Sequence, residues 1–86
     1  NQEYLNYIKE ITLENSLIKN VSSIKVRKYA GSQIIEMTIN LEPDLPVYKA
    51  HQISDNVKDK IIKELEEKHI KDVIIHIHPV NFSSNS

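Results

Sequence analysis

Two stretches of alternating apolar and polar residues flank the pair Gly31-Ser32, which contains the only glycine of the chain. In residues 22–29 the apolar positions are Ile24 and Val26. In residues 33–42 they recur at every second position, at Ile35, Met37, Ile39 and Leu41. Alternation with a period of two predicts half-buried strands, and a glycine between them suits a turn with positive φ. The pattern therefore predicts an antiparallel hairpin that turns at Gly31-Ser32.

Two other segments show the three- and four-residue spacing that is typical of amphipathic helices. Residues 2–18 carry the apolar positions Tyr4, Leu5, Ile8, Ile11 and Ile18. Residues 46–68 carry a stronger stripe and begin with a proline, which is favoured at the first position of a helix; this stripe comprises Ala50, Ile53, Val57, Ile61 and Leu65. At about 100° per residue, His51 falls at the edge of the stripe, between core and solvent.

Residues 72–78 predict a third strand, which Pro79 ends. Its apolar side chains share one face, and His76 and His78 share the other. Residues 81–86 are polar and predict a disordered tail.

The predicted order is helix, strand, strand, helix, strand, which indicates an α+β fold of the ferredoxin-like kind. The three-stranded sheet would carry both helices on one face, with one hairpin strand and the last strand pairing in parallel. The chain of 86 residues forms one domain, residues 1–80. Its core is small, and a homodimer would cover the second sheet face and a free edge.

Composition excludes several classes of protein. The chain has no cysteine, which rules out a disulfide scaffold and a thiolate metal site. A net charge of −1 and a single strand aromatic, Tyr29, argue against nucleic-acid binding. A phosphate loop, a cysteine nucleophile and a linked catalytic triad are all missing, so we expect no enzyme. No apolar run reaches the roughly 20 residues that span a bilayer. The chain does not begin with methionine, which suggests a fragment of a longer protein whose remainder could be membranous.

His76 and His78 form the strongest candidate binding motif. Residues two apart on a strand leave the same face roughly 7 Å apart, so both imidazoles can converge on one divalent ion. Neutral imidazole suits zinc and the later first-row metals. His51 is the candidate third ligand, and three histidines plus a water would complete a tetrahedral zinc shell. The alternative is two polar residues on a solvated face; His69, near the helix end, is interpreted as a structural cap or surface residue.

The stretch from residue 21 to residue 79 resembles the cytoplasmic C-terminal domain of the cation diffusion facilitator family of metal-efflux transporters. The matching pieces follow in order: Arg27 with Gly31, Glu42-Pro43-Asp44-Leu45-Pro46, Ala50-His51, and Asp72-Val73-Ile74-Ile75-His76-Ile77-His78-Pro79. Their spacing matches over about two thirds of the chain.

The resemblance implies a metallochaperone-like fold without the cysteine pair, and a homodimer. It also implies a position on the cytoplasmic side of the cell membrane, below a transmembrane domain of the same polypeptide that exports zinc or a related divalent ion against protons. Metal binding near the dimer interface would draw the two protomers together and bias transport.

The resemblance also implies which residues bind metal. His51 and His76 match ligand positions of the family, whereas His78 stands where many members have an aspartate. Ser22 and Thr38 occupy the places of two further histidines, so the resemblance favours one zinc ion on His51, His76 and His78. Two alternatives stay open: a metal-free structural dimerisation domain of the transporter, and an unrelated ferredoxin-like binding module.

Overall fold

The order of helices and strands is the predicted one. The computed structural model describes residues 1–79, and the predicted tail at residues 81–86 lies outside this range. The elements are helix α1 (Gln2–Leu13), strands β1 (Asn20–Tyr29) and β2 (Ser32–Leu41), helix α2 (Val47–Glu64), the short 3-10 helix η1 (Glu66–Lys68) and strand β3 (Ile70–Pro79).

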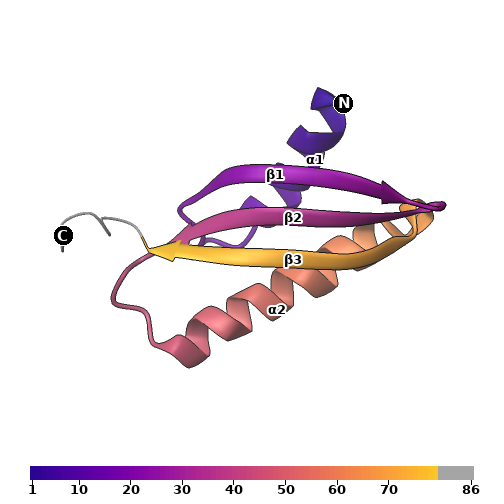
Figure 1. The fold of residues 1–86 in the computed structure, drawn as a ribbon. Helices are drawn as coiled ribbons and strands as arrows, with labels where there is room; N and C mark the ends of the chain where they lie inside the picture. Colours follow the sequence, from indigo (N-terminus) through magenta and orange to yellow (C-terminus); the bar gives the residue numbers. More distant parts are fainter. Residues whose placement is uncertain (80–86) are drawn as a thin grey trace.

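The strands form one sheet in the order β1-β2-β3, with β2 in the centre. β1 and β2 are antiparallel, whereas β2 and β3 are parallel, because α2 carries the chain back across the sheet between them. Both helices lie against one side of the sheet (Figure 1). The fold class is therefore confirmed, including the parallel pairing of a hairpin strand with the last strand.

The core lies between the helices and one sheet face. The alternating positions of β2 point into it, and Ile35, Met37 and Ile39 are fully buried there. They pack with Ile8 and Ile11 of α1 and with the α2 residues Ile53, Val57 and Ile61. The other sheet face, which we call the open face, carries Arg27, Glu36, Thr38, His76 and His78. The helices therefore leave this polar face uncovered.

Both helices end earlier than predicted. α1 ends at Leu13 rather than near residue 18, and the side chain of Asn15 accepts a hydrogen bond from the Leu17 N–H at 3.0 Å. A side chain that bonds the backbone locally competes with the helix. α2 ends at Glu64, and His69 closes η1 with a φ of 56°, its N–H donating to the carbonyl of Glu66. His69 is exposed, which fits the prediction of a structural cap or surface residue.

The hairpin turns one residue earlier than predicted. Ser32 pairs with Tyr29, so the two-residue loop is Ala30-Gly31 rather than Gly31-Ser32. Both loop residues have positive φ, 45° and 90°. Positive φ at both positions is the signature of a type I′ turn, in which asparagine followed by glycine is favoured. Alanine is disfavoured there, because its Cβ crowds the following carbonyl oxygen.

We expect Ala30→Asn to raise the free energy of unfolding by about 0.5–1 kcal/mol, because asparagine tolerates the left-handed conformation. Urea unfolding followed by circular dichroism measures this change. Gly31→Ala is a substitution with the opposite expected effect: alanine tolerates the positive φ of this position less well than glycine, so the free energy of unfolding should fall. Apart from Gly31 itself and its two chain neighbours, no heavy atom lies within 4 Å of the added Cβ, so its loss of stability reports the backbone conformation alone. Destabilisation by Ala30→Asn would contradict the assigned turn.

Candidate metal centre

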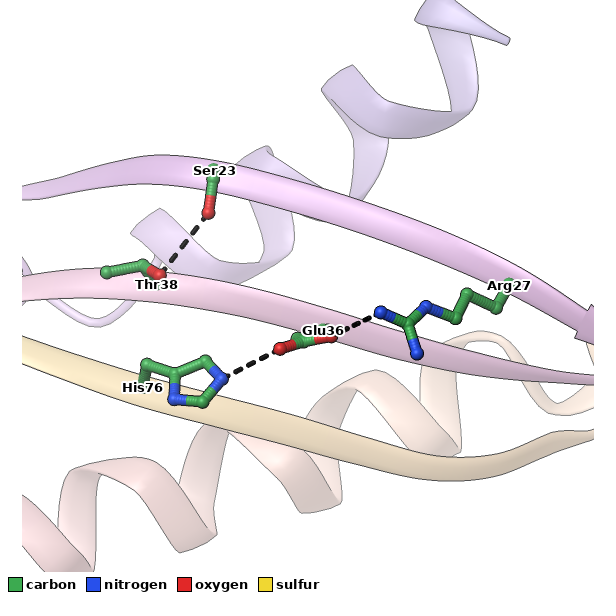
Figure 2. Close-up of polar contacts among 5 residues, drawn as sticks. All are labelled: Ser23, Arg27, Glu36, Thr38 and His76. Carbon is green, nitrogen blue, oxygen red and sulfur yellow. Dashed lines mark hydrogen bonds and ion pairs between the residues drawn. The ribbon is translucent and has the colours of Figure 1, made fainter.

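His76 lies on the open face of β3, within reach of a carboxylate on the neighbouring strand. Its Nε2 is 2.9 Å from Oε2 of Glu36 on β2. The other carboxylate oxygen of Glu36 is 3.3 Å from a guanidinium nitrogen of Arg27 on β1. Figure 2 shows this chain of polar contacts running across all three strands. His76 is thus already held in a defined orientation.

The charges around Glu36 favour its ionised form. The hydrogen bond from His76 lowers the pKa of the Glu36 carboxyl below its ordinary value. Partial burial acts in the opposite direction, and the positive charges of Arg27 and Lys25 lower this pKa further. Glu36 is therefore a carboxylate at neutral pH and accepts hydrogen bonds rather than donating them.

His78 also lies on β3, exposed on the open face, as predicted from the alternation. It pairs in register with Asn40, and His76 pairs with Thr38. The two histidines are two residues apart on one strand, so their side chains leave the same face roughly 7 Å apart along it. The structure thus brings these two candidate ligands to one part of the open face.

His51 lies in the first half of α2, on the helix side of the sheet. It is exposed and lines a shallow pocket of about 210 Å³ together with Leu41, Ala50 and Ile77. Ile77 stands between the two β3 histidines and points to the opposite face. His51 therefore lies beside the same end of β3, but it approaches from the other side.

One chain does not gather the three predicted ligands. Within residues 1–79, no three histidine, cysteine or acidic side chains are grouped closely enough to hold a metal ion. The hydroxyls of Ser22 and Thr38, the two residues that the resemblance set in the places of further histidines, are in hydrogen bonds with Asn40 and Ser23. The imidazole nitrogens of His51, His76 and His78 are nevertheless ligands that zinc accepts. The types of ligand atom therefore fit zinc, but one chain does not bring enough of them together, and a further ligand is needed to complete the site.

Glu36 is the residue that sequence reasoning missed. The alternation of residues 33–42 placed it on the polar face of its strand, which was a usable signal. What was missing was the register between β2 and β3, which brings the side chain of His76 diagonally to Glu36 rather than only to its direct partner Thr38.

Comparisons with known proteins identify a matching family and two relatives. The family described as "Cation efflux protein, cytoplasmic domain" matches residues 1–80. The uncharacterized transporter YdbO of Bacillus subtilis is 38% identical over an alignment of 65 residues, and the match covers 72% of this chain and 21% of that protein. The cation-efflux pump FieF of Pectobacterium carotovorum is 26% identical over 74 residues, 86% of this chain and 24% of the pump. The chain thus spans less than a quarter of the length of these relatives.

Solved structures share the fold. The metal-bound C-terminal domain of the CzcD transporter from Thermotoga maritima superposes with a TM-score of 0.85 at 21% identity, covering 93% of this chain and 91% of that one. A nickel form of the MamM C-terminal domain superposes with a TM-score of 0.82 at 19% identity, covering 92% of this chain and 98% of that one.

Two further observations bear on the type of protein. In the part of the chain that the structure describes, no helix is long and apolar enough to cross a bilayer. The matched family is one of transporter domains. Since the family match covers nearly the whole chain, the protein belongs to the cytoplasmic domains of cation efflux proteins, which are the C-terminal domains of the cation diffusion facilitators.

Proposed function

We propose that residues 1–80 form the dimerising, metal-binding regulatory domain of a transporter that exports zinc or a related divalent cation. The observation that carries the proposal is the pair His76 and His78 on the open face of β3, in a chain of the cation efflux family. His51 supplies the third imidazole. Family membership excludes the alternative of an unrelated ferredoxin-like module.

A second protomer completes the site in this proposal. The described part of one chain groups no three ligands, and His51 faces the other side of the sheet from His76 and His78. β3 is an edge strand, and the open face beside it is uncovered by either helix. A two-fold dimer would bring His51 of each protomer to β3 of its partner and so form two equivalent sites. Metal would then bind between the protomers.

Metal regulates by binding one arrangement of the dimer more tightly than the others. A ligand shifts a conformational equilibrium only by its difference in affinity for the two states. Bound between α2 of one protomer and β3 of the other, a zinc ion favours the closed dimer. The transmembrane part of the polypeptide, on whose cytoplasmic side the domain lies, would sense this closure.

Zinc is the proposed ion because three imidazoles and one water complete the tetrahedral shell of four ligands that zinc prefers. Neutral imidazoles also accept cobalt, nickel and copper, so availability and geometry decide between these metals. All three histidines bind in their neutral form. Protons therefore compete with the metal ion for the ring nitrogens, and the affinity falls as the pH is lowered.

Titration calorimetry with zinc tests the proposal. We expect the double substitution His76→Ala and His78→Ala to weaken zinc binding by at least about tenfold, because two of three protein ligands are lost. His69→Asn is the matched control: it removes an exposed imidazole just before the first residue of β3, at the opposite end of this strand from His76 and His78, and asparagine tolerates the left-handed conformation of this position. Its zinc affinity should stay unchanged.

The rival interpretation is a structural dimerisation domain that binds no metal. It predicts that the double variant and the wild type behave alike and that zinc leaves the melting temperature unchanged. Binding to the native state alone raises the melting temperature, so a zinc-dependent rise that the double variant lacks supports the metal site. Unchanged zinc affinity in the double variant would refute the assignment of His76 and His78.

A further inference from the structure

The three strands of the sheet each contribute one residue to a continuous polar chain on the open face. Arg27 of β1 contacts Oε1 of Glu36, and His76 of β3 contacts Oε2 through its Nε2. Both carboxylate oxygens of Glu36 are therefore engaged, one by each neighbour (Figure 2). The Glu36 side chain is only 28% exposed, so its position is constrained by packing as well as by these contacts.

The hydrogen bond between Glu36 and His76 decides which ring nitrogen of His76 carries the hydrogen atom. A glutamate carboxylate at neutral pH has only acceptor oxygens. The nitrogen that faces it at 2.9 Å, Nε2, must therefore be the donor. In the neutral imidazole the second nitrogen, Nδ1, then has a free lone pair. Figure 2 shows this second nitrogen on the side of the ring away from Glu36.

We propose that Glu36 is a positioning residue of the metal site, which fixes the ring of His76 and presents Nδ1 as its metal-binding nitrogen. The proposal rests on the function proposed above, in which His76 is a ligand. A carboxylate that accepts the second N–H of a ligating histidine orients the ring and raises its basicity. Arg27 holds the same carboxylate from the other strand.

Glu36 is not a metal ligand in this arrangement. Each oxygen already accepts one contact, from His76 or from Arg27, and the carboxylate acts on the site through the His76 ring that it orients. The assignment also gives a direction of approach. The ion reaches His76 from the side of the ring opposite to β2, where the sheet ends at the edge strand β3.

The first test uses the metal-free protein. Long-range nitrogen–proton correlation spectra of the imidazole rings, at a pH where they are neutral, should show His76 as the Nε2–H tautomer with a hydrogen-bonded proton. Glu36→Ala should release this proton to fast exchange and mix the tautomers. Glu36→Gln should keep the tautomer, because an amide oxygen still accepts. Glu14→Gln is the control, since it removes a carboxylate from an ion pair with Lys60 on the helix side.

The second test uses the zinc-loaded protein. Ring chemical shifts should identify Nδ1 as the zinc-bound nitrogen of His76 in the wild type. Glu36→Ala should weaken zinc binding by about 10–100-fold, Glu36→Gln by less, and Glu14→Gln not at all. Coordination through Nε2 would overturn the inference, as would an unchanged affinity in Glu36→Ala.

The two proposals fail in different ways. Zinc binding that needs His76 but ignores Glu36→Ala overturns the role of Glu36 alone. Zinc binding that is indifferent to His76→Ala overturns the proposed metal site, and the role of Glu36 falls with it. A circular dichroism melt of each variant distinguishes a lost contact from a lost fold.

Discussion

Replacing Ile61 by alanine should lower the free energy of unfolding by about 2–5 kcal/mol, the range found for removing a large aliphatic side chain from a packed core. Ile61 lies in α2 with 0% of its surface exposed. It packs into the cluster that joins α2 to the central strand. The substitution removes its apolar contacts and leaves a cavity that the surrounding side chains fill only in part.

The loss is large relative to the whole stability of the domain. A domain of this size is stable by only about 0.05–0.15 kcal/mol per residue, which is roughly 4–13 kcal/mol in total. Each kcal/mol lowers the melting temperature of a small domain by about 4–8 °C. We therefore expect a fall of at least about 8 °C in a thermal melt followed by circular dichroism.

Ile62→Ala is a matched control on the next residue of the same helix. Ile62 is 39% exposed, so the same atoms are removed from a half-solvated position. The gain in helix propensity from isoleucine to alanine is the same at both positions and cancels in the comparison. We expect a loss below about 1 kcal/mol, as for most surface substitutions. Equal losses from the two variants would contradict the packing of α2 on the sheet.

The faces of the elements could be predicted from the sequence, because side chains alternate along a strand and repeat every three to four residues along a helix. Ile35, Met37 and Ile39 are buried as their alternation indicated. The ends of the elements could not be predicted, because single polar contacts decide them. α1 stops where Asn15 bonds the backbone, and the hairpin turns at a position where an alanine adopts positive φ.

The candidate site likewise has features that the sequence predicts and features that it does not. The strand alternation placed His76 and His78 on one face, and the helix stripe placed His51 at a boundary between core and solvent. The contact between Glu36 and His76 depends on the register of two parallel strands that are joined through a whole helix. No local pattern encodes that register. The same patterns predicted that His51 faces the other side of the sheet from His76 and His78. They could not decide whether His51 reaches round the sheet edge or meets the strand of a partner chain; within residues 1–79 no three such ligands are grouped.

Mixing two defective variants should restore zinc binding. His51→Ala keeps both histidines of β3, and the double variant His76→Ala with His78→Ala keeps the helix histidine. Each variant alone lacks at least one ligand in every possible site. If the site forms between protomers, a mixed dimer contains one complete site, made by the helix of one chain and the strand of the other.

The expected stoichiometry follows from the two-fold symmetry. Random exchange makes about half of all dimers mixed, and each mixed dimer has one intact site out of two, so the mixture should bind about a quarter of the zinc that the wild type binds. Calorimetry after the two variants have been unfolded and refolded together measures this fraction. The control replaces the second partner by a chain that lacks all three histidines, which cannot complete a site. Binding no better than that control would refute a site shared between the two protomers, because a mixed dimer would then contain no complete site.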